Sequence, residues 1–229
     1  MPWRVCLEAI LIVSVSVKIC GITDRPALEA ALDGGARFIG LVFYPPSPRS
    51  LSHDAAATLA NLVPAKVGRV GVFVDPRDDE LTAILARVPL DLIQLHGNES
   101  VGRLDAIRAL TGKRLIKAIK VARAEDVAAA APFAASADWL LYDAKVPSGQ
   151  GLGLPGGNAI AFDWKLLSGR AAKGREGWIL SGGLSAANIS EAIRITGAGA
   201  VDVSSGVESA PGRKDPGAIR AFLKAAGAA

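Results

Sequence analysis

Cys20 is a nucleophilic side chain that stands where a short β-type run ends. The stretch SVKICG, residues 16 to 21, sets this thiol directly before a glycine, in a chain with only two cysteines. The reactive form would be the thiolate, but a thiol with an ordinary pKa of about 8.5 is mostly protonated at neutral pH. Lys18 would share a strand face with Cys20 because side chains alternate, although alternation alone establishes no contact. A small buried hydrophobe is the alternative role for Cys20.

Two glycine-rich turns, SGGL at 181 to 184 and SSG at 204 to 206, close later β-type runs. Glycine lets backbone N–H groups approach an oxyanion closely, and a helix N-terminus adds a favourable dipole. Either turn alone is typical of a tight turn that binds nothing. Because the two follow the seventh and eighth strands, where barrel enzymes bind phosphate, together they predict a phosphate site.

Three further polar residues follow β-type runs. Arg49 lies in the loop after the second run, His96 closes the fourth and Asp143 closes the sixth. The alternatives are a solvated surface charge for Arg49, a hydrogen-bonded rim residue for His96, and an N-cap or solvated carboxylate for Asp143. His53 is expected at a helix boundary. With two histidines in the chain, the sequence shows no cluster of metal ligands.

The elements that must position these residues alternate between short apolar runs and alanine- and leucine-rich helical patterns. The eight expected strands are 16–19, 38–43, 67–74, 92–95, 114–119, 139–143, 178–181 and 200–204. The expected helices start at Pro26, Asp54, Asp78, Ser100, Arg123, Ala186 and Asp215. Nearly continuous apolar strands are typical of a parallel sheet buried on both faces. Eight βα units predict an α/β fold, a single (βα)8 TIM barrel, rather than an open doubly wound sheet. The functional residues would then share the rim at the C-terminal ends of the strands.

One barrel domain is expected over residues 15 to 229, preceded by an N-terminal extension at 1 to 14. That extension superficially resembles an export signal, but Glu8 interrupts its apolar run and no cleavage site follows. The glycine-rich segment 144 to 164 breaks the βα rhythm. Because the strand pattern resumes after it, the segment is predicted to be a mobile active-site loop rather than a linker between domains.

Composition restricts the classes of partner. The formal net charge of +4 is modest and the basic residues are scattered, which argues against a nucleic-acid surface and suits a small anionic ligand. Two cysteines cannot form a disulfide framework, so a reducing, cytoplasmic location is expected. No run of eighteen apolar residues occurs, and no membrane span is predicted.

An ordered series of short motifs resembles the phosphoribosylanthranilate isomerase family of tryptophan biosynthesis. The series is KICG (18 to 21), FYPPSPR (43 to 49), VGVFV (70 to 74), QLHG (94 to 97), LYDAK (141 to 145), FDW (162 to 164), LSGGL (180 to 184), VDVSSGVE (201 to 208) and GRKD (212 to 215). No single motif is diagnostic, but their order is highly specific. The resemblance implies an Amadori rearrangement of N-(5-phosphoribosyl)anthranilate to 1-(2-carboxyphenylamino)-1-deoxyribulose 5-phosphate, without metal or organic cofactor.

The resemblance also implies a role for individual residues. Cys20 would be the general base and Asp143 the general acid, while Arg49 would face the anthranilate carboxylate. Backbone amides of four residues would hold the phosphate: Gly182, Gly183, Ser205 and Gly206. Asp202 matches a rim aspartate of the family without a derived role, and Gly156 and Gly157 fall where the family has a GGxG turn. The loop departs from the family by the stretch QGLGLP, which leaves its phosphate contacts unassigned.

Two other functions compete with this one. The related phosphosugar isomerase of histidine biosynthesis relies on a pair of aspartates and shows a two-fold sequence repeat, which this chain lacks. A barrel that binds a phosphorylated ligand without catalysis would need neither Cys20 nor Asp143. The expected partner is a small phosphorylated substrate, and the sequence leaves a monomer and a homodimer both open.

Overall fold

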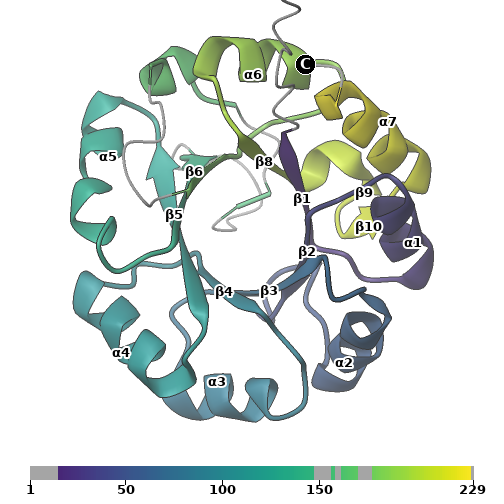
Figure 1. Cartoon of the computed structure of the whole chain (residues 1–229), viewed down its shortest axis with the longest axis vertical. Coiled ribbons are helices and arrows are strands. Elements are labelled where there is room, and N and C mark those ends of the chain that lie inside the picture. Colours follow the sequence, from purple (N-terminus) through teal and green to yellow (C-terminus); the bar gives the residue numbers. More distant parts are fainter. Residues whose placement is uncertain (1–14, 147–155, 158–160, 170–176, 228–229) are drawn as a thin grey trace, which may run out of the picture.

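The strands of this chain close into one barrel. The structure, a computed structural model, describes residues 15–146, 156–157, 161–169 and 177–227. Eight strands lie in sequence order around the barrel, with the helices in a ring outside them (Figure 1). They are β1 (Ser16–Cys20), β2 (Phe38–Val42), β3 (Gly68–Phe73), β4 (Leu92–Leu95), β5 (Arg114–Val121), β6 (Trp139–Ala144), β7 (Gly177–Leu180) and β8 (Ala200–Val203). Every neighbouring pair is parallel, including β1 with β8. The prediction of a single (βα)8 barrel is confirmed.

The helices follow the predicted order, with differences at their ends. They are α1 (Arg25–Asp33), α2 (His53–Leu62), α3 (Asp78–Leu85), α4 (Val101–Thr111), α5 (Ala124–Ala128), α6 (Ile189–Thr196) and α7 (Pro216–Gly227), with short 3₁₀ turns η1 (Ala131–Phe133), η2 (Trp164–Leu167) and η3 (Ser205–Val207). The expected start of α2 at Asp54 is wrong, because the Ser52 hydroxyl caps the helix and Asp54 lies in its first turn. The expected start of α6 at Ala186 is also wrong, since the helix begins at Ile189.

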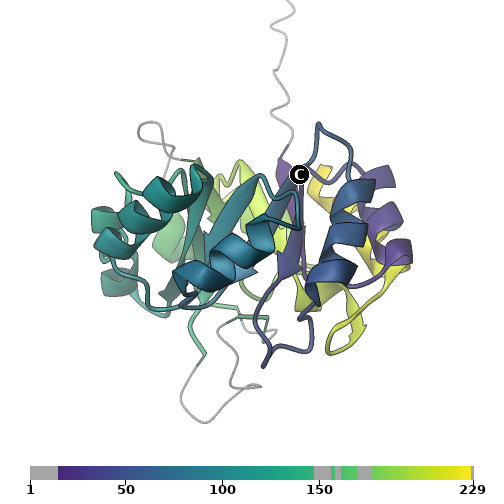
Figure 2. The same cartoon turned by 90° about the horizontal axis from the view of Figure 1, so that it is seen from below.

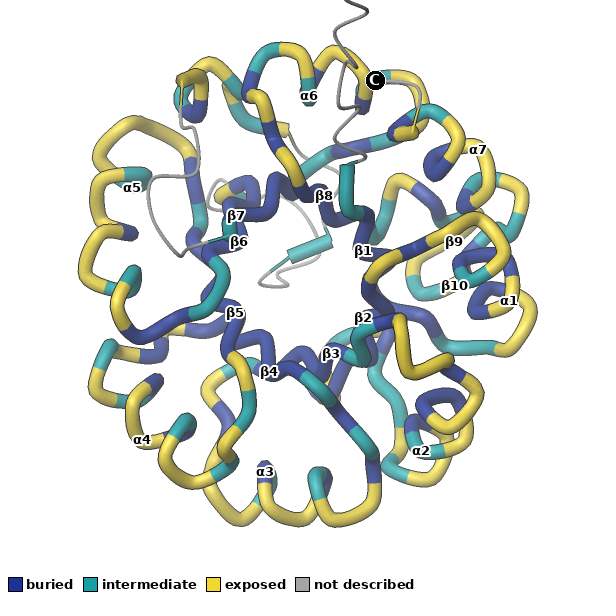
Figure 3. The backbone as a smooth tube through the Cα atoms, viewed as in Figure 1, coloured by how far each residue is buried: buried dark blue, intermediate teal, exposed yellow. Residues whose placement is uncertain are grey.

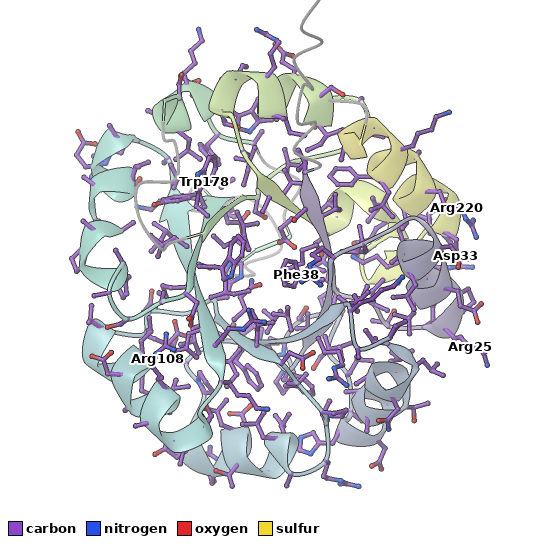
Figure 4. All side chains as sticks on the ribbon, viewed as in Figure 1. Arg25, Asp33, Phe38, Arg108, Trp178 and Arg220 are labelled. Atoms are coloured by element: carbon purple, nitrogen blue, oxygen red, sulfur yellow. The ribbon has the colours of Figure 1, made fainter. Side chains whose placement is uncertain are left out.

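Alternation along the strands separates two cores. One face of the strands points into the barrel and carries a buried cluster: Phe38, Val70, Leu92, Ile116, Ala118, Leu141, Ile179 and Ala200. Figure 4 shows Phe38 in the middle of the barrel, Trp178 between the sheet and the helices, and Arg25 and Arg220 at the periphery. The barrel strands are mostly buried, with their less buried residues chiefly at their first positions, whereas the helices are exposed on their outer faces (Figure 3). The apolar inner cluster therefore closes the barrel interior, and the polar residues at the C-terminal ends lie beyond it.

A short β-hairpin that the sequence analysis did not predict follows β8. Its strands are β9 (Glu208–Ala210) and β10 (Arg213–Lys214), which pair antiparallel. Gly212, in the turn, has φ +79°, and an added Cβ there would meet the carbonyl oxygen of Pro48 at 2.4 Å. The hairpin thus packs closely against the loop after β2, and Figure 2 shows both segments at the same end of the barrel.

A buried ion pair connects the loops after β3 and β4 to β5. Lys117 Nζ lies 2.6 Å from Glu99 Oε2 and donates to the Gly97 carbonyl oxygen at 2.9 Å. Glu99 Oε1 accepts the backbone N–H groups of Asp75 and Gly97. Burial alone would raise the pKa of Glu99, but Lys117 and these backbone hydrogen bonds outweigh it and lower that pKa. Glu99 therefore binds its proton less tightly when the chain is folded.

Glu99→Gln should lower the free energy of unfolding by about 3 kcal/mol at pH 7, because it leaves Lys117 as a buried unpaired charge. A lowered folded-state pKa contributes stability above the unfolded value of about 4.3, and that contribution is lost as the pH falls below it. The loss caused by Glu99→Gln should therefore shrink toward acid pH in denaturant titrations. The matched control is Glu29→Gln in the exposed pair with Arg25, which should cost less than about 0.5 kcal/mol. Equal losses in the two variants would contradict the prediction.

Candidate active site

The C-terminal ends of the strands surround a pocket that all ten predicted site residues line. These are Cys20, Arg49, Asp143, Gly156, Gly157, Gly182, Gly183, Asp202, Ser205 and Gly206. Strand alternation explains part of this convergence. Leu141 belongs to the inner cluster, so Asp143, two residues further along β6, also faces inward, and Asp202 follows Ala200 on β8 in the same way. The pocket therefore begins where the apolar interior of the barrel ends.

Cys20 lies beside a buried ion pair between β1 and β8. The register pairs Lys18 with Asp202, and Lys18 Nζ is 2.9 Å from Asp202 Oδ1. Ser181 donates its hydroxyl to the other carboxylate oxygen at 3.3 Å. Gly40 is paired with Cys20 on β2, and an added Cβ there would lie 2.9 Å from the thiol and 3.1 Å from Lys18 Nζ. The missing side chain of Gly40 leaves room for the thiol and the ammonium to be neighbours, a contact that the sequence left open.

Burial and charge act on the Cys20 thiol in opposite directions. Burial raises the pKa of Cys20, and the positive charge of Lys18 beside it opposes that rise without cancelling it. For Lys18, burial alone would lower the pKa, but Asp202 and Cys20 outweigh it and raise that pKa. Lys18 is only 1% exposed and stays charged, so a thiolate on Cys20 would have its counter-ion in place.

Asp143 is hydrogen-bonded to His96 at the end of β4. His96 Nε2 lies 3.2 Å from Asp143 Oδ2, and Gln94 Nε2 lies 3.0 Å from His96 Nδ1. The backbone N–H of Ala144 donates to Asp143 Oδ1. With the amide in this orientation, Gln94 donates to Nδ1 and the ring proton on Nε2 faces the carboxylate. His96 is thus the hydrogen-bonded rim residue expected from the sequence, and Asp143 is a buried carboxyl rather than a solvated one.

Arg49 is held by a carboxylate that the sequence analysis did not single out. Its Nε and Nη2 lie 2.8 and 2.9 Å from the two oxygens of Glu208, and Nη2 also donates to the Gly157 carbonyl oxygen at 3.1 Å. Lys214 Nζ lies 2.6 Å from the same carboxylate. Arg49 is 4% exposed, so the alternative of a solvated surface charge is wrong. The sequence offers little indication of this ion pair, because Glu208 is far from Arg49 along the chain.

The two glycine turns after β7 and β8 pack against each other. Gly182 and Gly183 have φ values of +87° and +63°, a backbone conformation that favours glycine. A Cβ on Gly182 would lie 2.6 Å from the backbone nitrogen of Ala144, and one on Gly206 would lie 1.8 Å from the carbonyl oxygen of Leu184. Glycine is thus required at these positions by backbone shape and by close packing. That these turns bind phosphate stays a prediction.

Part of the long loop after β6 reaches the same pocket. A Cβ on Gly156 would lie 2.8 Å from Asp143 Oδ2, and one on Gly157, which has φ +73°, would lie 2.6 Å from Arg49 Nη1. The predicted mobility of the loop and its stretch QGLGLP concern residues 147–155 and 158–160, outside the described residues. The N-terminal extension at 1–14 also lies outside them.

Two further features concern the described residues only. No group of three or more His, Cys, Asp or Glu side chains there is arranged to hold a metal ion. In the same part of the chain, every helix is too short or too polar to cross a bilayer.

Comparisons with known proteins identify relatives of this chain. The sequence model of the N-(5′-phosphoribosyl)anthranilate (PRA) isomerase family matches residues 17–225. A protein of that name from Paramagnetospirillum magneticum is 55% identical over 212 residues, which cover 93% of this chain and 97% of the relative. The crystal structure of the Thermotoga maritima phosphoribosyl anthranilate isomerase is 36% identical, with a TM-score of 0.82 over 94% of this chain and 100% of that one.

A second solved structure shows what such a barrel binds. It is a phosphoribosyl anthranilate isomerase in complex with reduced 1-(o-carboxyphenylamino)-1-deoxyribulose 5-phosphate, 34% identical, with a TM-score of 0.79 over 94% of this chain and 100% of that chain. The molecule bound to that protein carries a phosphate and a benzoate carboxylate. Since the family model and the relatives both span nearly the whole of it, this chain belongs to the N-(5′-phosphoribosyl)anthranilate isomerase family.

Proposed function

We propose that this chain, a member of an isomerase family of tryptophan biosynthesis, converts N-(5-phosphoribosyl)anthranilate into 1-(2-carboxyphenylamino)-1-deoxyribulose 5-phosphate by acid–base catalysis. The observation that carries the proposal is one pocket in which a thiol stands beside an ammonium group and a carboxyl stands beside an imidazole. The thiol beside the ammonium group suits proton removal, and the carboxyl beside the imidazole suits proton delivery. They come from β1 and β6, three strands apart around the barrel, so a sugar between them is approached from two sides.

The rearrangement needs one proton donor and one proton acceptor. Asp143 protonates the furanose ring oxygen as its bond to C1′ breaks, and the anthranilate nitrogen supplies the electron pair that forms the Schiff base. Cys20, as thiolate, removes the proton from C2′, which gives an enolamine that tautomerises to the ketone. The hydrogen bond between Asp143 and His96 supports the first role, since it fixes the carboxyl at the wall of the pocket.

The substrate's two anionic ends suggest its orientation in the pocket. Arg49 faces the anthranilate carboxylate, for which a guanidinium offers paired N–H donors. The glycine turns at Gly182 and Gly206 receive the phosphate through their backbone N–H groups. Asp202 acts on the chemistry through Lys18, whose charge and position it holds. Whether the protein acts as a monomer or a homodimer stays a prediction.

The first test is turnover of freshly generated phosphoribosylanthranilate, followed by the loss of its fluorescence, with and without a chelator. The wild-type protein should consume the substrate in both conditions. Cys20→Ser and Asp143→Asn should each lower kcat by about 100- to 10,000-fold, because each removes one proton-transfer group. Both variants should retain binding of the reduced product. A folded wild-type protein that leaves the substrate unchanged would favour the barrel that binds without catalysis.

Lys18→Met should shift the pH dependence of turnover toward alkaline pH. Burial raises the pKa of Cys20 and Lys18 counteracts it, so loss of Lys18 leaves the thiol harder to ionise. The rising limb of kcat against pH should move up by about one unit or more, as expected for loss of an adjacent opposite charge. Lys117→Met is the matched control, since Lys117 is also buried but lies outside the pocket. An unchanged pH profile in Lys18→Met would remove Lys18 from thiol activation.

A further inference from the structure

We infer that Glu208 is a positioning residue that makes the pocket selective for a substrate carboxylate, by fixing which edge of Arg49 faces the ligand. The inference rests on the proposed function, because it takes Arg49 as the partner of the anthranilate carboxylate. It concerns a residue that does not touch the reacting atoms. Its effect on ligand selection is transmitted through Arg49, and binding measurements separate that effect from catalysis.

Only part of the Arg49 guanidinium is hydrogen-bonded to other described residues. Of its five N–H groups, the one on Nε and one on Nη2 donate to Glu208, and Gly157 accepts from Nη2 as well. That leaves the two N–H groups of Nη1, which have no hydrogen-bond partner among the residues that the structure describes. Arg49 lines the pocket, so Nη1 is the part of the guanidinium left for an anionic ligand.

The Glu208 carboxylate is held in place by hydrogen bonds from three residues. Its Oε1 accepts from Arg49 Nε and from Lys214 Nζ, and its Oε2 accepts from Arg49 Nη2 and from the backbone N–H of Gly212. The four acceptor positions of the carboxylate are thus filled. Burial alone would raise the pKa of Glu208, but Arg49 and Lys214 outweigh it and lower that pKa, so the carboxylate is ionised at neutral pH. Because every acceptor position of this ionised carboxylate is occupied, Glu208 cannot rotate without breaking several hydrogen bonds.

The hairpin explains why these groups are held at this place. The antiparallel register pairs Lys214 with Glu208, so one element delivers the carboxylate and its second cation together. Lys214 also donates to the Ser204 carbonyl oxygen at 3.0 Å, next to the turn after β8. Burial lowers the pKa of Lys214, an effect that the adjacent Glu208 opposes, and a protonated Lys214 leaves the cluster with two cations and one carboxylate. A ligand carboxylate at Nη1 would supply the missing negative charge, whereas a neutral arylamine would not.

The test compares two ligands that differ only in that carboxylate. One is the reduced 1-(o-carboxyphenylamino)-1-deoxyribulose 5-phosphate, and the other is its counterpart made from aniline. The wild-type protein should bind the carboxylate ligand at least about tenfold more tightly in calorimetric titrations, which corresponds to about 1.4 kcal/mol. Glu208→Asp keeps the charge of the cluster but withdraws the carboxylate by one methylene, and Glu208→Gln removes the charge.

Both variants should bring the ratio of the two dissociation constants to within about threefold of one, while affinity for the aniline ligand changes by less than about threefold. The matched control is Glu99→Asp, another buried, lysine-paired glutamate, which should lower stability and leave the ratio unchanged. If Glu208→Gln does not fold, Glu208→Asp decides the question. Variants that retain the wild-type ratio would overturn the role of Glu208 while leaving the proposed function intact. A wild-type protein that binds neither ligand would overturn the proposed function itself.

Discussion

The buried pair between Lys18 and Asp202 is the interaction on which the site depends. It joins β1 to β8, the two strands that close the barrel, and both side chains point into the interior just above the apolar cluster. Either charge alone at this depth would be costly, because an unpaired buried ion loses its hydration without compensation. The register that sets Lys18 opposite Asp202 is therefore needed both for closure of the barrel and for the electrostatics around Cys20. The ion pair between Lys18 and Asp202 thus contributes both to the fold and to the proposed chemistry.

A second buried network of ion pairs also acts on Cys20. Arg49, Glu208 and Lys214 come from the loop after β2 and the hairpin after β8, the loops of strands that flank β1. Lys214 bears on the thiol as well, because its charge favours the thiolate. The two networks contain three basic side chains and two carboxylates, Asp202 and Glu208, and burial lowers the pKa of one of the bases, Lys214. This surplus of basic groups is consistent with a pocket for a substrate that carries both a phosphate and a carboxylate.

The sequence predicted what depends on local pattern. Apolar runs and their spacing predicted the barrel, and a period of two along the first strand predicted that Lys18 shares a face with Cys20, although it did not establish their contact. It could not predict the partner of Arg49, because no local rule connects residues that far apart and the hairpin carrying Glu208 has strands of two or three residues. The contact of Asp143 with His96 depends on how β4 and β6, the two neighbours of β5, bring their C-terminal ends together, which only the assembled sheet determines.

The position of the pocket follows from how a small barrel must fill its interior. Phe38 and its neighbours occupy the lower part of the barrel, and Gly40 follows Phe38 on the same face of β2, where a larger residue would collide with both Cys20 and Lys18. Glycine weakens a strand because it has no side chain to pack. At this position, however, the missing side chain leaves room for the thiol and the ammonium group to be neighbours. A stable barrel interior thus favours a residue with a side chain at position 40 of β2, whereas the contact between the thiol and the ammonium group requires glycine. The sequence has glycine there.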